Sequence, residues 1–236
     1  MQYIFTFYQT YFYDFVIGTL NTIFIVTCSL FFGLILAIPL GIILANNNTN
    51  KIISALISFY SYIFRTTPML LQLYLIYFGL GLFFAEKNIL ENILKSKNFW
   101  AIFSFSLNTA AYTLQIIKTA IINSDKSEII AAKGYAFSDA TIKFQIIFRQ
   151  SLPSLIRNYS NEVIYMLHGS AIVSTIAVFD LTQAAKTAYF QSFNPYLPFI
   201  SAALIYLSIT AFILLVFHYL EFFSLKIKRK TAVNNL

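Results

Sequence analysis

Two charged residues, Glu162 and Lys118, lie inside long apolar stretches of the sequence. An ionisable side chain is costly in lipid, so a charge inside a spanning segment marks a candidate functional site. Each lies about one helical turn from the polar end of its stretch, so the two could form an ion pair. Glu162 could instead offer its negative charge to a cationic substrate, while Lys118 reaches the membrane surface and Asn161 bonds to a neighbouring helix.

A histidine and small residues follow near the middle of the same stretch, at His168, Gly169, Ser170 and Ala171. Small side chains leave room there, so His168 and Ser170 are candidates to line a substrate cavity. A histidine that only packs between helices is the alternative, and both interpretations stay open. His218, close to a basic tail, is expected at the membrane interface.

A polar break interrupts another apolar stretch at Arg65, Thr66, Thr67 and Pro68. Threonine is a good helix N-cap and proline is favoured at the first helical position, so one helix should end here and another begin. The positive end of a broken helix can face an anionic substrate group. Arg65, Thr66 and Thr67 are therefore candidates to bind a carboxylate, and a kink that packs against a neighbouring helix is the alternative.

Catalytic and metal-binding patterns do not occur in the sequence. The two histidines have no cysteine or carboxylate at metal-ligand spacing, and there is no Gly-rich phosphate loop of the Walker type. Cys28 is the only cysteine, so neither an intrachain disulfide nor a cysteine metal site can form. We expect no enzyme activity, no metal and no cofactor in this chain.

Composition places these residues in a membrane protein. Hydrophobic residues make up 58% and charged residues 11%, whereas soluble domains carry about 25% charged residues. The apolar runs are continuous rather than alternating, which excludes a transmembrane β-barrel. The predicted fold class is all-α, as one polytopic transmembrane domain over residues 1–236.

Five apolar segments are long enough for spanning helices, which need about 20 residues. Residues 1–15, before the first span, are rich in tyrosine and phenylalanine and are expected at the membrane interface. Gly33 and Gly41 in the first span allow a neighbouring helix to approach closely. The predicted spans are about Val16–Ala45, Ile52–Ala85, Phe99–Ile122, Tyr159–Phe179 and Tyr196–Phe223.

The distribution of lysine and arginine predicts the orientation. With the N-terminus outside, the cytoplasmic segments carry 10 of these residues and the outer segments carry 4. Positive charge is enriched on the cytoplasmic side of membrane proteins. The sequence therefore predicts five transmembrane helices with the N-terminus outside and the C-terminus in the cytoplasm.

The longest polar interruption is Asn123–Arg157, which holds 8 of the chain's 25 charged residues in 35 positions. The predicted orientation places it in the cytoplasm. Ser127–Tyr135 and Ala140–Phe148 both have helical character, and Ser138 with Asp139 supplies N-cap chemistry for the second. We expect two short helices folded on each other.

Four stretches of the sequence carry a family likeness: SEIIAAKGYAFSDATIKF in the polar loop, YIFRTTPMLLQLYLIYFG at the break, SLNTAAYT in the third span and YSNEVIYMLHGSAIVST in the fourth. Together they resemble the membrane subunits of ATP-binding-cassette (ABC) importers for polar amino acids. The likeness is greatest to the subunits that serve histidine, lysine and arginine import. The resemblance implies the type I importer permease fold.

The same resemblance identifies residues 123–157 as the cytoplasmic "EAA" loop that docks on the ATPase. The chain departs from the family pattern at four points. The usual Glu-Ala-Ala begins at Ile130, the usual following glycine is Ala136, and a common third-span glutamate is Gln115. The usual Leu-Pro falls at Phe148 and Arg149, with Pro153 four residues further on. The residues implied in ATPase coupling are Glu128, Ala131, Ala132, Gly134, Tyr135, Ala136 and Phe137.

These observations predict the permease subunit of an ATP-driven importer for polar amino acids, with arginine, lysine and histidine favoured, in the inner membrane. The implied partners are nucleotide-binding ATPase subunits, a second permease subunit, identical or similar, an external amino-acid-binding protein and membrane lipid; no nucleic acid is expected. ATP would be used by the partner ATPase. Two alternatives stay open, namely a secondary transporter or channel that needs no ATPase and a membrane scaffold that transports nothing.

Overall fold

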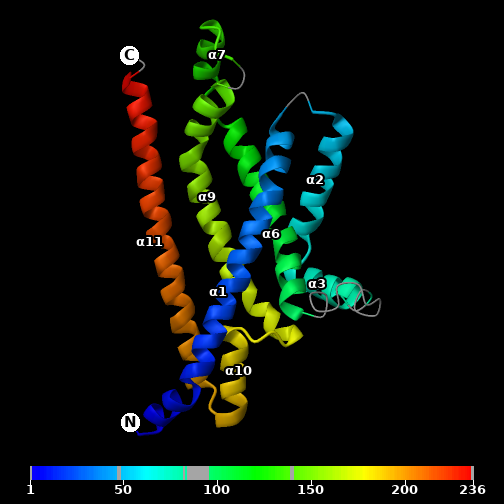
Figure 1. Ribbon diagram of the computed structural model, residues 1–236, viewed down its shortest axis with the longest axis vertical. Helices are drawn as coiled ribbons and strands as arrows, with labels where there is room; N and C mark the ends of the chain where they lie inside the picture. The colour runs from blue at the N-terminus through cyan, green and yellow to red at the C-terminus, as the bar shows by residue number, and fades with distance from the viewer. Residues whose placement is uncertain (1, 47–48, 82, 84–95, 139–140, 235–236) are drawn as a thin grey trace.

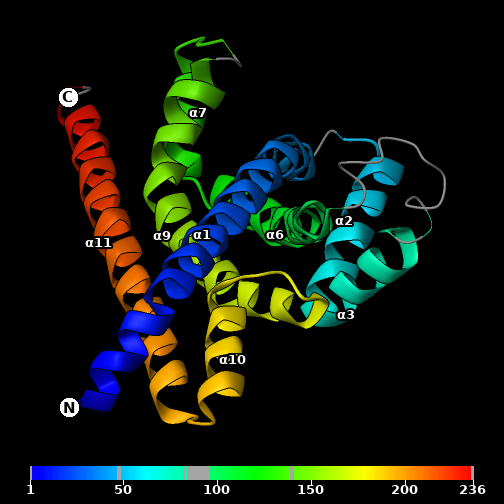
Figure 2. The same cartoon turned by 60° about the horizontal axis from the view of Figure 1, so that its bottom comes forward.

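A computed structural model of the chain describes residues 2–46, 49–81, 83, 96–138 and 141–234, and Figures 1 and 2 show it from two directions. The elements assigned in these residues are helices, as the all-α prediction requires. In chain order they are α1 (Gln2–Ala45), α2 (Lys51–Thr66), α3 (Met69–Tyr74), the π-helix η1 (Leu75–Gly81), α6 (Lys97–Ile122), α7 (Lys126–Gly134), the π-helix η2 (Ile142–Ile147), α9 (Phe148–Gly169), the 3₁₀ helix η3 (Ser170–Ile176), α10 (Leu181–Ser192) and α11 (Tyr196–Asn234).

Three long helices, α1, α6 and α9, form the centre of the molecule (Figure 1). α1 packs along α6, and α9 packs against both α6 and α11. α2 packs on α6. Where α2 ends, the chain continues into α3 and η1, which turn away from the axis of α6 (Figures 1 and 2). α6 is thus the helix that touches both the broken segment and α9.

Glycine allows the close contact between α1 and α6. A Cβ atom added at Gly33 would lie 2.3 Å from Cγ2 of Thr109, and one added at Gly41 would lie 2.9 Å from Cβ of Ile117. Real Cβ atoms do not approach other carbons so closely, so these positions need glycine. The predicted close approach along the first span is confirmed, with α6 as the partner.

The largest buried cluster lies where α1, α3, α6, α9 and η3 meet. Its members include Ile25, Leu73, Phe105, Met166 and Val173, which are almost fully buried. In a membrane such helices associate through van der Waals packing rather than through the hydrophobic effect. This packing fixes α6 and α9 relative to the break between α2 and α3.

Within the described residues, two helices are long and apolar enough to cross a membrane, over Ile4–Ala45 and Tyr196–Lys226. The helices Gln145–Ile176 and Leu181–Ser192 together provide a third if the pair, bent by 51°, forms one span. α6, from Lys97 to Ile122, covers the residues of the predicted third span but is not among these candidates. The full five-span topology stays a prediction.

The aromatic N-terminal segment is part of α1 rather than a separate segment before the first span. α1 begins at Gln2 and runs without a break to Ala45. Phe7, Tyr11 and Phe15 occur four residues apart, so they share one helix face, and they are buried in a cluster with residues of α10 and α11. Packing on that face extends the helix beyond the predicted start at Val16.

The second loop helix predicted over Ala140–Phe148 is not separate. Residues 139–140 lie outside the described residues, and η2 covers Ile142–Ile147 and continues directly into α9. The predicted fourth span, Tyr159–Phe179, is therefore not one helix: α9 begins earlier, at Phe148, and ends at Gly169, and η3 continues to Ile176. The first loop helix is confirmed as α7, one residue earlier at each end than the predicted range.

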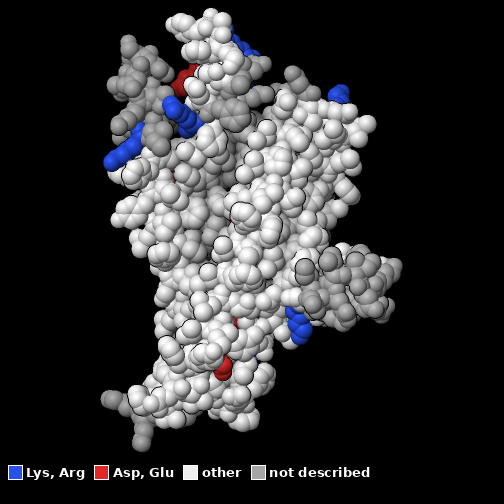
Figure 3. Space-filling model, viewed as in Figure 1, with Lys and Arg blue, Asp and Glu red and all other residues white. Residues whose placement is uncertain are grey.

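Lysine and arginine side chains gather at the end of the molecule that carries α7 and the C-terminus (Figure 3). Most of the surface between the two ends shows neither acidic nor basic side chains in this view. Large apolar side chains such as Phe24, Phe31, Leu207 and Phe212 are exposed on α1 and α11. This pattern is that of a helical protein surrounded by lipid.

Candidate functional site

The break between α2 and α3 forms at Thr67 and Pro68, which both have extended backbone conformations. Proline disfavours the helical conformation of the residue before it, so α2 ends there. The Thr67 hydroxyl donates to the Ile63 carbonyl at 2.7 Å, and the Thr66 hydroxyl donates to Tyr62 at 2.8 Å. The predicted break is confirmed, but the prediction of a threonine N-cap for the next helix is wrong, because both hydroxyls bond back to α2.

Two buried amides hold this break in place. Gln72 of α3 donates from Nε2 to the carbonyls of Phe64, at 2.8 Å, and Thr67, at 2.9 Å. Asn108 of α6 donates from Nδ2 to Oε1 of Gln72 at 2.8 Å. The sequence interpretation missed both residues, although a glutamine and an asparagine inside apolar runs were the available signal. Together they fix the broken end of α2 to α6.

Arg65 lies at the end of α2 and is exposed. Its guanidinium lies 5.6 Å from the centre of the Tyr112 ring of α6, and the Tyr112 hydroxyl donates to the Arg65 carbonyl at 3.3 Å. Tyr112 also contacts Tyr165 of α9, with ring centres 5.6 Å apart. Within the described residues, no carboxylate pairs with Arg65. Its charge is therefore oriented by an aromatic ring and can still bind an anion.

Glu162 is 5% exposed, and its Oε1 atom has no hydrogen-bond partner among the described residues. No ion pair joins it to Lys118 in the described part of the chain, so the ion-pair interpretation is not supported. The carboxylate lies beside the buried Thr109 hydroxyl of α6, but the two groups do not meet the geometry of a hydrogen bond. A buried carboxylate without an ion-pair partner is costly, so this position favours binding of a cation or a proton.

Residues on two consecutive turns of α6 thus contact both the helix break and α9. Asn108 bonds to Gln72, Thr109 lies beside Glu162, and Tyr112 contacts Arg65. We call the group of Arg65, Gln72, Asn108, Thr109, Tyr112, Glu162 and Tyr165 the central polar cluster. In this cluster the cationic Arg65 of α2 and the anionic Glu162 of α9 both contact residues of α6.

His168 and Ser170 make their polar contacts elsewhere. His168 is exposed and its Nε2 atom lies 3.1 Å from the Thr210 hydroxyl of α11. Ser170 is buried and donates to the Leu167 carbonyl at 2.7 Å. Six residues separate His168 from Glu162, which places them on different faces of α9. The structure joins Arg65 and Glu162 through α6 but does not show His168 in the same cluster.

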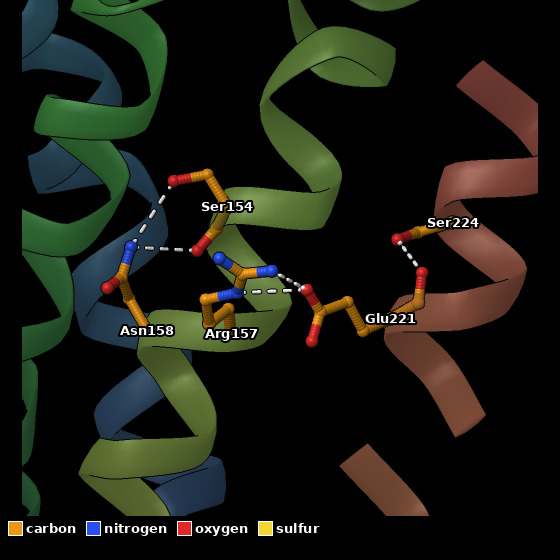
Figure 4. Close-up of polar contacts among 5 residues, drawn as sticks. All are labelled: Ser154, Arg157, Asn158, Glu221 and Ser224. Atoms are coloured by element: carbon orange, nitrogen blue, oxygen red, sulfur yellow. Dashed lines mark hydrogen bonds and ion pairs between the residues drawn. The ribbon is translucent and has the colours of Figure 1, made fainter. Parts of the chain in front are cut away.

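A cleft of about 350 Å³ opens between α9 and α11 near the α7 end. Arg157 pairs there with Glu221, with Nε donating to Oε1 at 2.9 Å (Figure 4). His218, predicted at the membrane interface, lines the same cleft. The ion pair connects α9 to α11 at a point where the Arg157 side chain is 70% exposed.

The helix α7 begins and ends at well-defined caps. Asp125 accepts a hydrogen bond from the Ser127 N–H at 2.8 Å, which caps the start. At the end, the Phe137 N–H bonds to Ala132 and the Ala136 N–H bonds to Lys133, which is the Schellman pattern. Ala136 has a φ of 57°, in the left-handed region that costs a residue other than glycine about 1–2 kcal/mol.

Comparison with known proteins decides the family. The model of the binding-protein-dependent transport system inner membrane component family matches residues 37–223. The chain belongs to this family.

Individual relatives agree with the family match. The chain is 35% identical over 191 residues to the nopaline transport system permease protein NocM of Agrobacterium fabrum, covering 77% of this chain and 76% of that protein. It is 32% identical over 206 residues to the histidine/lysine/arginine/ornithine transport system permease protein HisM of Salmonella typhimurium, covering 86% and 87%. The likeness therefore extends over most of each protein.

Solved structures share the fold. An amino acid ABC transporter crystallised with histidines matches with a TM-score of 0.79 and 27% identity, over 90% of this chain and 94% of that one. A subunit of the MetNI methionine ABC transporter, in an inward-facing conformation, matches with a TM-score of 0.74 and 17% identity, over 90% and 96%. The chain thus has the ABC importer permease fold, and membership of this family makes it an inner membrane component.

Family membership gives the conformation of Ala136 a meaning. The resemblance drawn from the sequence places the family's usual loop glycine at this position, and the positive φ is the conformation that glycine adopts without strain. The loop of this chain has a left-handed residue at this position although it lacks the glycine. Ile130, Tyr135 and Phe137 are exposed around this turn.

Proposed function

We propose that this chain is the permease subunit of an ATP-driven importer that carries polar amino acids, with basic side chains favoured. The names of its relatives support the class, since HisM is a histidine/lysine/arginine/ornithine permease and NocM is a nopaline permease. An amino acid with a basic side chain has a carboxylate at one end and a cation at the other. The central polar cluster offers a charge of the opposite sign for each.

The observation that carries the substrate proposal is the buried carboxylate of Glu162, which has no ion-pair partner and whose Oε1 atom has no hydrogen-bond partner among the described residues. It would receive the cationic side chain, because a buried charge is strongly stabilised by an ion pair. Arg65 would receive the α-carboxylate, for which a guanidinium has the matching geometry. Thr66 and Thr67 shape the break that presents Arg65, and we retain His168 and Ser170 as candidates further along α9.

The proposed topology has five membrane spans with the N-terminus outside and the C-terminus in the cytoplasm. The lysine and arginine count favours this orientation, and the basic side chains visible at the α7 end of the molecule (Figure 3) agree with it. α7 would then face the cytoplasm, where its exposed Ile130, Tyr135 and Phe137 are available to a protein partner.

That partner would be a nucleotide-binding ATPase subunit, which uses the ATP, while this chain binds no cofactor. The proposed ATPase-coupling region is α7 and the turn after it. Ala131, Ala132, Gly134, Tyr135, Ala136 and Phe137 would contact the ATPase, and Glu128 would support them from the first turn of α7. A second permease subunit and an external amino-acid-binding protein would complete the assembly. Membership of the binding-protein-dependent transport family supports the two soluble partners, the ATPase subunit and the external binding protein.

The test uses the native complex, purified with its ATPase subunits and reconstituted in proteoliposomes with the binding protein. We expect ATP hydrolysis to be stimulated by arginine, lysine or histidine more than by glutamine. Glu162→Gln should remove that preference, since a neutral amide no longer pairs with a cation. Glu221→Gln is the matched control, because this carboxylate pairs with Arg157 outside the central polar cluster.

An unchanged preference for arginine over glutamine in Glu162→Gln would rule out the proposed role of this carboxylate. Purification of a stable, transporting assembly that contains no nucleotide-binding subunit would rule out the importer class itself.

A further inference from the structure

One side chain from α9 holds the start of α7. Gln150 lies in the first turn of α9, and its Oε1 atom accepts a hydrogen bond from the Asp125 backbone N–H at 2.8 Å. Its Nε2 atom donates to the carboxylate of Glu128. Gln150 therefore uses both ends of its amide on the first turn of α7.

These two contacts determine the direction of α7. Asp125 is the N-cap of the helix, so its own N–H has no partner within α7. Glu128 lies in the first turn, where a negative charge is stabilised by the positive end of the helix. The bond from Gln150 to this carboxylate is charge-assisted and so is stronger than a bond between neutral groups. The start of α7 is thus attached to α9 at two points.

The position of Glu128 excludes it as a replacement for the glutamate that usually begins the Glu-Ala-Ala motif. That position is Ile130, two residues further on, and residues two apart lie about 200° apart around a helix. Ile130 is 69% exposed, whereas the Glu128 carboxylate points to Gln150. Glu128 therefore anchors α7 within this chain.

α9 connects this anchor to the central polar cluster. The helix runs from Phe148 to Gly169, and Gln150 and Glu162 both lie in it. They are 12 positions apart, which corresponds to about 18 Å along one helix. Pro153 lies between them, and the helix continues through it. A displacement of α7 that is passed to Gln150 therefore reaches the helix that carries Glu162.

We infer that Gln150 is a positioning residue that fixes α7 to α9, so that movement of α7 is transmitted to the substrate-binding part of α9. The inference rests on the proposed function, in which the ATPase moves α7. It assigns to Gln150 and Glu128 a role within the chain, distinct from contact with the ATPase.

The first experiment measures amino-acid uptake per ATP hydrolysed, with the complete complex and its binding protein in proteoliposomes. Gln150→Ala should lower this ratio by at least about tenfold, as expected for the loss of a hydrogen bond to a charged group. The ATPase subunit should still co-purify, because the exposed residues of α7 are unchanged. The matched control is Gln145→Ala, which removes an exposed glutamine of η2, one helical turn or so before Gln150.

The second experiment exchanges the two side chains. Gln150→Glu places a second carboxylate against Glu128, and the repulsion should lower the ratio at least as much as Gln150→Ala does. Combining Gln150→Glu with Glu128→Gln restores one amide and one carboxylate in the opposite order, so the ratio should return to within about twofold of the original protein.

Three results separate the possible failures. If the unmodified complex shows no substrate-stimulated ATP hydrolysis, the proposed function fails and this inference fails with it. If the unmodified complex works and Gln150→Ala matches Gln145→Ala, only the positioning role is wrong. If the exchanged pair is no better than Gln150→Glu alone, the contact between the two side chains does not carry the coupling.

Discussion

Asn108 of α6 donates a hydrogen bond of 2.8 Å to the side-chain oxygen of Gln72, and this pair joins α6 to the segment after the helix break. Gln72 in turn donates hydrogen bonds to the carbonyls of Phe64 and Thr67. These carbonyls lie at the end of α2, where backbone carbonyls have no partner within the helix. These hydrogen bonds fix the backbone at the break, and they thereby fix the backbone position of Arg65 just before it.

Replacing Gln72 should destabilise the protein. Gln72→Leu leaves buried polar groups of α2 and α6 without partners, and we expect the free energy of unfolding to fall by about 1–2 kcal/mol. Thermal unfolding in detergent measures the change, with Gln191→Leu, at an exposed position of α10, as the control. Equal melting temperatures for the two variants would contradict the structural role of Gln72.

Gly33 should tolerate no side chain. An added Cβ would lie 2.3 Å from Cγ2 of Thr109, so Gly33→Ala must either push α1 away from α6 or displace Thr109. Thr109 lies beside Glu162, so its displacement would also disturb that carboxylate. We expect a loss of about 1–3 kcal/mol in stability. Gly79→Ala is the control, because no heavy atom lies within 4 Å of its added Cβ. If the two variants were equally stable, α1 and α6 would have room for a methyl group between Gly33 and Thr109, and the close contact would be wrong.

Ala136 should gain stability as glycine. Ala136→Gly removes the cost of a left-handed alanine, and about 0.5–1 kcal/mol should remain after the greater entropy of glycine in the unfolded chain. Hydrogen exchange of the α7 amides measures the local change. Ala131→Gly, inside α7, should have the opposite sign, with a loss of up to about 1 kcal/mol. Slower exchange in Ala131→Gly than in Ala136→Gly would refute the assigned conformation.

Arg65 should affect substrate binding more than folding. Arg65→Gln removes the guanidinium proposed for the α-carboxylate, and we expect KM to rise at least about tenfold, which corresponds to about 1.4 kcal/mol. Lys51→Gln, at the first position of the same helix, serves as the control for loss of positive charge. Uptake measured over a range of arginine concentrations separates KM from the maximal rate, and an unchanged KM would remove Arg65 from the proposed site.

Local sequence signals predicted those features that depend on neighbouring residues. The break at Arg65–Pro68 follows from the restrictions that proline imposes. The helical character of Ser127–Tyr135 predicted α7 to within one residue at each end, although the Asp125 cap was not foreseen. The end of α6 at Ile122 follows from the polar segment that begins at Asn123.

Other features depend on contacts between distant residues, and local signals were insufficient there. α1 extends to Gln2 because Phe7, Tyr11 and Phe15 pack against α10 and α11. η2 continues into α9, so the second loop helix has no independent existence. Thr67 bonds back to Ile63 instead of capping the next helix, while Gln72 from one turn further on satisfies the break.

The sequence by itself determined the membrane class, the all-α fold, the break and the residues with a charge in apolar surroundings, because each follows from composition or from residues close in the chain. Only the tertiary structure decided which of them act together. Glu162 lies beside Thr109 rather than Lys118, and Arg65 reaches α9 through Tyr112. The physical reason is that the rotation and packing of α6 against α2 and α9 set these distances, and the helices concerned are far apart in the sequence.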